Sequence, residues 1–459
     1  MAAKKRRSTA TKAAVGTGDR TSSTVDEMLL AALERGDDSF QTGRFLATFK
    51  EGAVDAGIQA FSSSRGMRVA DARDFDDQSV VMEDVADADA VVFPEIGVAV
   101  VGGEAARSRG MSAASEIAAD SAIESIDPEY FVFAEGTGDE YLRLYGDGGT
   151  TGPINPGDYL RGFVRAAETI AKDLYGGAGG GAPIAESEEE ALVLGATWGI
   201  VACRVPPSPR SGNGIKVAVL DTGMDLGHPD FSGRPIVSAS FVGQPVQDLH
   251  SHGTHCIGTA CGPLAPAGST PRYGVAYRSL IHVGKVLSNS GSSVGASVLA
   301  GMNWAIARRC QVISLSLGGP GGPQPSYTAA GQAALNNGLL MVAAAGNSAS
   351  PTGSPANSPT IMSVAALDQN LRPAVFSNFG KIEIAGPGVN TFSSVPRPTR
   401  YGIKSGTSMA TPHVAGCAAL WAETSASLRG ILLWRRLQAT ARRLPFPASR
   451  VGAGLVQAP

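Results

Sequence analysis

The sequence predicts an α/β fold in which a large parallel-sheet domain, with helices on both faces, follows a smaller α+β unit of ferredoxin-like type. Strands buried on both faces of a parallel sheet are indicated by four near-continuous apolar runs, at 215–220, 280–287, 312–317 and 339–345. Helical patterns lie between these runs, at about 252–261, 293–309 and 327–336. Such alternation is typical of an α/β domain, whose ligands bind at the carboxyl ends of the strands.

The smaller unit is predicted from the pattern of residues 41–135. Val54, Ile58 and Phe61 share one helical face, and the run over 90–101 is apolar and rich in β-branched residues. The order strand, helix, strand, strand, helix, strand is that of a split βαβ sandwich. In chain order, the expected elements are a strand at 44–50, a helix at 53–63, strands at 69–75 and 90–101, a helix at 104–122 and a strand at 123–133.

Composition divides the chain into four segments. Residues 1–40 are expected to be a disordered, polar tail with a short helical pattern around 25–33. Its basic cluster, Lys4 to Arg7, is interpreted as a solvated tail rather than as a nucleic-acid contact. Residues 136–190 are rich in Gly and predict a linker with room for one helix at 158–175. Residues 41–135 and 191–459 form the two folded units.

Net charge, apolar segments and cysteine content indicate which binding partners and which cellular compartment to expect. The net charge of −3 over 459 residues predicts no general attraction to nucleic acid or to acidic membranes. No apolar stretch is long enough to span a bilayer, and the basic N-terminus lacks the apolar segment of a signal peptide. The five cysteines are odd in number and lack paired-motif spacing, so we expect buried free thiols. A cytoplasmic or leaderless protein is therefore expected, with export by another route left open.

Two polar motifs lie at a strand end and a helix start. The strand over 216–221 ends in Asp221, a carboxylate that is costly to bury unless a partner holds its charge, although it could also cap the turn before Gly223. A helix then opens with His252 and His255. Zinc is not favoured, because the Glu of H-E-x-x-H is absent and no third ligand is near. We expect His252 to be exposed at the helix start and His255 to be packed and hydrogen-bonded.

Two further polar residues complete the set. Ser408 stands just ahead of a helix whose start is predicted from Pro412, because proline fits only a first helical turn. The positive end of the helix dipole would favour negative charge beside Ser408, although an ordinary N-cap serine is the alternative. Asn347 follows the apolar run at 339–345 and could either form a turn or donate its amide NH₂ to an oxyanion.

The chain order Asp, His, Asn, Ser makes these four sites informative together. With their surrounding motifs they resemble the subtilisin-like serine peptidases over residues 197–458. Asp248 lies where that family often has an acid, and Cys256 is similar to its proteinase K-like branch. The matching segments are Val-Ala-Val-Leu-Asp-Thr-Gly at 217–223, His-Gly-Thr-His-Cys at 252–256, Val-Ile-Ser-Leu-Ser-Leu-Gly-Gly at 312–319 and Gly-Thr-Ser-Met-Ala-Thr-Pro-His at 406–413.

The resemblance implies a serine endopeptidase with a catalytic triad of Asp221, His252 and Ser408. Asn347 and the backbone N–H of Ser408 would form the oxyanion hole. No cofactor is implied for catalysis. Asp230 occupies a position that often binds structural calcium in the family, but the segment 262–273 supplies no Asp, Asn or Glu as a further ligand.

The resemblance also implies where substrate binds. A peptide would add to an edge strand by main-chain hydrogen bonds, and this strand comprises Ser316, Leu317 and Gly318, with 288–292 as the second wall. Gly353 would lie at the floor of the pocket for the residue before the cleaved bond, and apolar residues of medium to large size are expected there.

The N-terminal unit, residues 44–134, looks like the inhibitor I9-type propeptides that cover the active site of these enzymes and template their folding. An unrelated ferredoxin-like domain is the alternative. The family usually joins the propeptide directly to the peptidase, whereas residues 136–190 intervene here. We therefore expect a self-inhibited zymogen whose partners are a peptide or protein substrate and its own propeptide. The competing hypotheses are a non-catalytic peptide binder and a processing enzyme for one partner.

Overall fold

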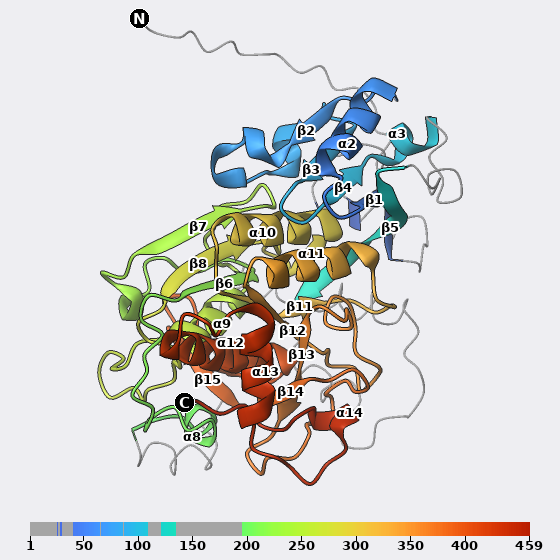
Figure 1. The fold of residues 1–459 in the computed structure, drawn as a ribbon. Coiled ribbons are helices and arrows are strands. Elements are labelled where there is room, and N and C mark those ends of the chain that lie inside the picture. Colours follow the sequence, from blue (N-terminus) through green and yellow to red (C-terminus); the bar gives the residue numbers. More distant parts are fainter. Residues whose placement is uncertain are drawn as a thin grey trace, which may run out of the picture.

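The chain folds into two stacked parts, a smaller N-terminal one and a larger C-terminal one (Figure 1). The computed structural model describes residues 25, 28–29, 40–64, 66–85, 87–108, 121–134 and 195–459. The expected linker, with its helix at 158–175, and most of the expected tail lie outside the described residues. Within the tail range, Val25, Met28 and Leu29 are helical, in agreement with the helical pattern expected around 25–33, and they are buried in an apolar cluster.

The larger part is built on a parallel sheet of seven strands, which confirms the predicted fold class. Its order is β14-β13-β12-β10-β6-β8-β7, and every neighbouring pair is parallel. The four expected runs become β6 (Lys216–Asp221), β8 (Leu280–Lys285), β10 (Val312–Leu315) and β12 (Leu340–Ala344). Sequence patterns do not single out the shorter strands β7 (Ile236–Ser240), β13 (Met362–Leu367) and β14 (Ile384–Pro387).

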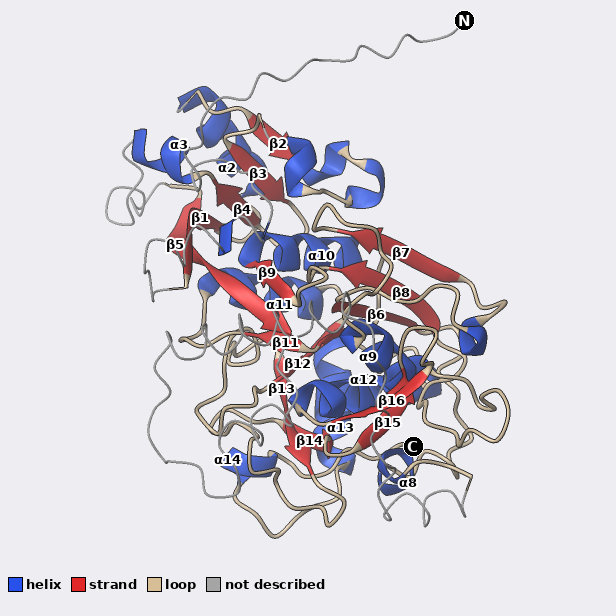
Figure 2. Ribbon diagram, turned by 180° about the vertical axis from the view of Figure 1, so that it is seen from behind, coloured by secondary structure: helices blue, strands red, loops and turns tan. Residues whose placement is uncertain are grey.

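Helices cover both faces of this sheet (Figures 1 and 2). One face carries α10 (Gly295–Ala307) and α11 (Pro325–Asn336). The other carries α9 (His252–Cys261) and α12 (Thr407–Thr424), with α13 (Gly430–Thr440) packed against α12. A hairpin of β15 (Thr391–Ser394) and β16 (Tyr401–Lys404) lies beside α9, and the short helices are α8 (Trp198–Ala202) and α14 (Ala448–Val451). Separate apolar clusters fill the two sides.

In the described residues of the N-terminal part, the strands form a sheet of order β5-β1-β4-β3-β2, accompanied by short helices. The expected single strand over 90–101 is wrong, because Pro94 and Gly97, at φ +66°, form the turn of a hairpin. The expected strand over 69–75 is too long, since Asp71 accepts the N–H of Arg73 and starts a 3₁₀ turn. The elements are β1 (Gln41–Phe49), α2 (Val54–Gln59), β2 (Val69–Asp71), β3 (Ala90–Phe93), β4 (Val98–Val101), α3 (Gly103–Ser108) and β5 (Ile123–Ala134).

Strand β5 joins the two parts. Its end runs antiparallel between β9 (Ser292–Val294) and β11 (Leu317–Gly318) of the larger part. The N–H of Ala134 also donates to the carbonyl of Gly291 at 2.7 Å. Because β11 follows β10 directly, β5 reaches the carboxyl edge of the parallel sheet, where ligands of such sheets bind.

The cysteines agree with prediction: all five, at positions 203, 256, 261, 310 and 417, are buried free thiols. Among the described residues, no helix has both the length and the apolar character needed to cross a membrane.

Candidate active site

Asp221 is the last residue of β6 and is buried beside His252. Its Oδ1 and Oδ2 lie 2.8 and 3.0 Å from Nδ1 of His252, and Oδ1 also accepts the N–H of Thr222 at 2.7 Å. A carboxylate can only accept, so Nδ1 carries the hydrogen and Nε2 is the acceptor nitrogen. Nε2 has no hydrogen-bond partner among the described residues. The imidazole is therefore oriented to take up a proton at Nε2.

A second buried carboxylate, Asp248, holds the start of α9. Its Oδ1 accepts the N–H groups of His250 and Ser251, each at 2.9 Å, and its Oδ2 accepts the N–H and the hydroxyl of Thr254 at 2.9 and 2.7 Å. These bonds offset the cost of the left-handed conformation of Ser251, at φ +77°. The expectation that His252 is exposed is wrong: its side chain is 2% exposed, because α9 is buried along its whole length.

Ser408 is the second residue of α12, which begins at Thr407. The prediction that Pro412 marks the first turn is therefore wrong, since it lies in the second. Proline has no N–H for the carbonyl four residues earlier, which is that of Ser408. The Ser316 hydroxyl donates to this carbonyl at 2.8 Å, and the Cys256 thiol at 3.5 Å. The side chains of Ser316 and Cys256 thus replace the missing helical hydrogen bond and connect the backbone of Ser408 to their two segments.

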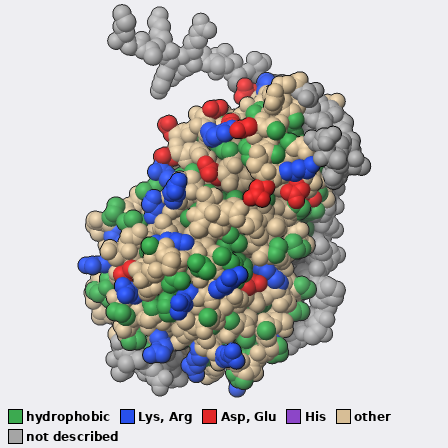
Figure 3. Space-filling model, in the orientation of Figure 1, with side chains coloured by type: hydrophobic (Ala, Val, Ile, Leu, Met, Phe, Trp, Pro, Cys, Tyr) green, Lys and Arg blue, Asp and Glu red, His purple; other side chains and the backbone are tan. Residues whose placement is uncertain are grey.

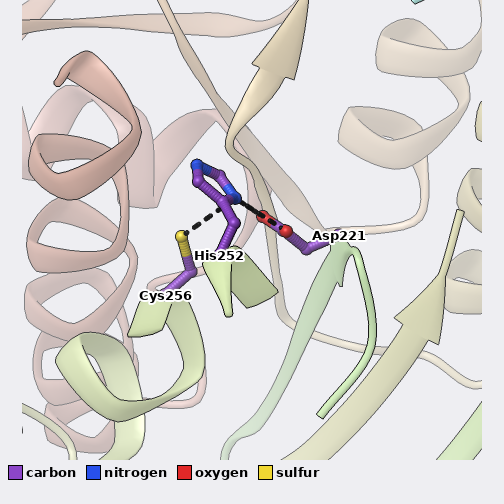
Figure 4. Close-up of side chains that lie close together, drawn as sticks. All are labelled: Asp221, His252 and Cys256. Carbon is purple, nitrogen blue, oxygen red and sulfur yellow. Dashed lines mark hydrogen bonds and ion pairs between the residues drawn. The ribbon is translucent and has the colours of Figure 1, made fainter. Parts of the chain in front are cut away.

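The thiol of Cys256 lies between the serine and the histidine. Its Sγ is 3.9 Å from Nδ1 of His252. Figure 4 shows this contact, with Asp221 bonded to the same nitrogen. The structure therefore pairs Asp221 with His252, whereas the Ser408 hydroxyl donates to the carbonyl of Ser316 at 3.2 Å. The role of Ser408 as the third triad member stays a prediction. Burial raises the pKa of the Cys256 thiol well above its usual range, so it stays protonated and unsuited to a metal.

His255 lies apart from this group and is packed, as predicted. Its Nε2 donates to the carbonyl of Thr391 in β15 at 2.9 Å. Burial lowers its pKa well below the usual value, so the ring is neutral. The two histidines of α9 therefore face different partners, which argues against the zinc alternative.

Asn347 follows β12 and faces the start of α12. Its Oδ1 accepts the N–H and the hydroxyl of Thr407 at 2.8 and 2.9 Å. These two donors fix the orientation of the Asn347 amide, because only its oxygen can accept their hydrogen bonds. Its Nδ2 group therefore points away from Thr407. At Gly406 a Cβ would lie 3.1 Å from Nδ2, so the backbone passes close to this amide.

The predicted substrate strand is paired with β5. Leu317 lies opposite Ala134 and Gly318 opposite Phe133, while Ser316 precedes them in the chain. Gly353 lies behind this strand, where a Cβ would come within 2.6 Å of the Gly319 carbonyl oxygen. Only glycine allows this approach, and the role of Gly353 in a substrate pocket stays a prediction.

Asp230 has a donor set that does not fit calcium. Its Oδ2 accepts the hydroxyl of Tyr273 at 2.6 Å, and its Oδ1 accepts the hydroxyl of Tyr401 at 3.1 Å and the N–H of Ala267 at 3.2 Å. Calcium requires several oxygen acceptors facing one point, whereas these groups all donate to the carboxylate. The calcium expected at Asp230 is therefore not supported, and the carboxylate instead accepts a hydrogen bond from Tyr401 of β16.

Sequence patterns do not single out Lys285, yet it lies beside Asp221. It is opposite Asp221 in the β6–β8 register and is fully buried. Its Nζ donates to the carbonyl of Thr222 at 2.5 Å and to Oδ1 of Asn289 at 3.0 Å. It thereby fixes the turn after Asp221. The available signal was a lysine within the apolar run at 280–287.

Comparison with known proteins agrees with this geometry. Residues 212–454 match the model of the subtilase family. An alkaline protease of Alkalihalobacillus alcalophilus is 40% identical over 60% of this chain and 71% of its own length. Subtilisin Savinase of Lederbergia lenta is 41% identical over 57% of this chain and 96% of its own length. The crystal structure of a cold-adapted subtilisin-like serine proteinase has a TM-score of 0.51 and 31% identity, covering 57% of this chain and 98% of that one. The chain belongs to the subtilase family and is a subtilisin-like serine endopeptidase. Members of this family need no cofactor for catalysis.

Proposed function

We propose that this subtilase cleaves peptide bonds through Asp221, His252 and Ser408 by way of an acyl-enzyme. Nε2 of His252 removes the proton of the Ser408 hydroxyl as Oγ attacks the carbonyl carbon, and the imidazolium then protonates the leaving amine. Asp221 holds the tautomer and stabilises the imidazolium. Water, deprotonated by the same nitrogen, then hydrolyses the ester and restores the serine. The observation that carries this proposal is the 2.8 Å hydrogen bond between Asp221 and Nδ1 of His252.

We assign the oxyanion hole to Nδ2 of Asn347 and the backbone N–H of Ser408. The fixed orientation of the Asn347 amide supports this role, because Thr407 donates both its hydrogen bonds to Oδ1 and the Nδ2 donor group faces the opposite direction. Preorganised donors of this kind stabilise the charge that develops on the tetrahedral intermediate without having to reorient during the reaction.

We further propose that the N-terminal part is an intramolecular inhibitor and that the chain is made as a zymogen. In support, β5 pairs with both β9 and β11, the two edges to which a substrate would add. A peptide cannot form the same main-chain hydrogen bonds while β5 remains there.

We also propose a position for the maturation cleavage, which the pairing register of β5 supports. Gly318 pairs with Phe133 and Leu317 with Ala134, so we expect the main chain just after Ala134 to reach Ser316. Because the Ser408 hydroxyl donates to the Ser316 carbonyl, we assign the cleaved bond to Glu135–Gly136, just outside the described residues. The first processed product should therefore begin at Gly136 when its N-terminus is sequenced at early times. A different first cut would refute this register.

A fluorophosphonate probe tests the catalytic assignment. It should modify Ser408 in the processed protein, and the Ser408→Ala variant should take up no label and accumulate as the full-length chain. A folded, processed protein that resists labelling would favour the non-catalytic peptide binder. A peptide library separates a general endopeptidase from a processing enzyme, since the latter would reject most of the library.

A further inference from the structure

The net charge of the whole chain conceals two regions of opposite sign. Residues 195–459 contain twenty Lys and Arg but seven Asp and Glu, whereas residues 1–194 contain eighteen and thirty-four. In Figure 3 most acidic side chains on the visible face lie over the N-terminal part, and Lys and Arg are spread over the larger part below. The expected lack of attraction to acidic membranes rested on the net charge of −3, whereas residues 195–459 alone carry a formal net charge of +13, from twenty basic and seven acidic residues.

The outer face of α13 places part of this charge beside exposed aliphatic side chains. Ile431 and Leu432 are 42% and 49% exposed, and the two arginines that follow at helical spacing are exposed on the same face. Two more exposed arginines come directly after the helix. The opposite face of α13 is buried through Leu433 and Leu437. We define the α13 patch as Ile431, Leu432, Arg435, Arg436, Arg442 and Arg443.

Acidic side chains near the α13 patch already have other partners. Glu423, on the neighbouring α12, accepts the N–H groups of Ser211 and Gly212 at 2.7 and 2.6 Å. Glu383 pairs with Lys381 at 2.9 Å. Within the described part of the chain, none of the four patch arginines forms an ion pair. No described carboxylate therefore neutralises these four guanidinium groups.

We propose that the α13 patch binds the surface of a bilayer that contains anionic lipids. The arginines would contact headgroup phosphates while Ile431 and Leu432 enter the boundary of the acyl chains, as in an interfacial amphipathic helix. Nucleic acid fits less well, because base stacking needs open aromatic faces: Trp434 is buried, and the guanidinium of Arg436 lies 5.2 Å over the ring of Trp421. An outward helix face also suits a flat surface better than an extended peptide, which binds at a groove or a strand edge. This inference does not depend on the proposed catalytic roles.

Vesicle sedimentation tests the proposal on the full chain carrying Ser408→Ala, which prevents self-cleavage. The chain should bind vesicles of phosphatidylcholine with phosphatidylglycerol at about 0.1 M salt and bind pure phosphatidylcholine much more weakly. Arg435→Gln with Arg436→Gln should lower the partition coefficient about 25-fold, roughly fivefold for each arginine near the membrane. Ile431→Ser with Leu432→Ser should lower it about tenfold, because less apolar area is buried.

The matched control replaces Arg278 and Arg309 by Gln. Both are exposed and lie outside the α13 patch, so binding should stay within about twofold of the parent. Circular dichroism confirms that each variant is folded. Equal binding to neutral vesicles, or an equal loss in the control, would overturn the proposal. Unchanged binding after the Ile431 and Leu432 substitutions would show a purely ionic contact and would also overturn it.

Discussion

The buried ion pair between Glu129 and Arg44 offers a quantitative test of how the two parts are held together. Glu129 in β5 lies 2.6 and 2.9 Å from two guanidinium nitrogens of Arg44, and its Oε1 accepts the N–H of Ala296, in the first turn of α10, at 2.7 Å. The two side chains are 0% and 1% exposed. Glu129→Ala removes a buried counter-charge and a helix cap at once. Breaking a buried pair by losing one partner costs about 3–5 kcal/mol.

Hydrogen exchange on the full-length Ser408→Ala chain measures this cost. The amide of Ala134, bonded to the Gly291 carbonyl, exchanges only when the end of β5 opens. If Glu129 secures β5 to α10, Glu129→Ala should speed this exchange by about 160- to 5,000-fold, at 1.36 kcal/mol for each factor of ten. The double variant Arg44→Met with Glu129→Leu, which leaves no unpaired charge, should stay within about tenfold of the parent. An increase below about fivefold in Glu129→Ala would refute the reasoning.

Three further predictions concern the larger part. Asn347→Ala should lower kcat by about 10²–10³ with little change in KM, a magnitude known for subtilisin rather than worked out from this structure; an unaltered kcat would rule out the oxyanion role. Burial lowers the pKa of His413 to about 4, so between about pH 4 and pH 6.5 this side chain is protonated in the unfolded chain but neutral in the folded protein. For the Ser408→Ala chain, the His413 contribution to the unfolding free energy should be constant above pH 6.5 and should fall by up to about 1.4 kcal/mol per pH unit from there towards pH 4. Urea titrations at several pH values should show a smaller dependence of the unfolding free energy on pH for His413→Gln. Tyr273→Phe should lower Tm without rescue by calcium, whereas a calcium-dependent Tm that Asp230→Asn abolishes would contradict the donor assignment.

The candidate site could be located from the sequence because its residues adjoin regular elements. Asp221 ends a buried strand and Ser408 lies at a helix start, so the strand and helix patterns alone place them at the edge of the sheet. Local pattern does not report side-chain orientation. His252 was expected to be exposed but is buried, and Pro412 was expected in the first turn but lies in the second.

The errors in the N-terminal part have a similar origin. Residues 90–101 are apolar on both sides of the turn at Pro94, so the run resembles one strand although it is a hairpin. The composition of this part likewise does not reveal that the end of β5 leaves its own sheet to pair with β9 and β11. That pairing depends on two free edges supplied by segments more than 150 residues further along the chain.

By itself the sequence indicated four of the buried parallel strands and the polar residues that follow them, because burial and helical periodicity are local properties of the chain. Tertiary structure alone decided which polar atoms meet. The bond from Ser316 to the Ser408 carbonyl spans 92 residues, and that from Tyr401 to Asp230 spans 171. Such contacts, the close packing around Gly353 and the pairing of β5 with β9 and β11 arise only when distant segments pack together, since no short stretch of sequence encodes the distance between them.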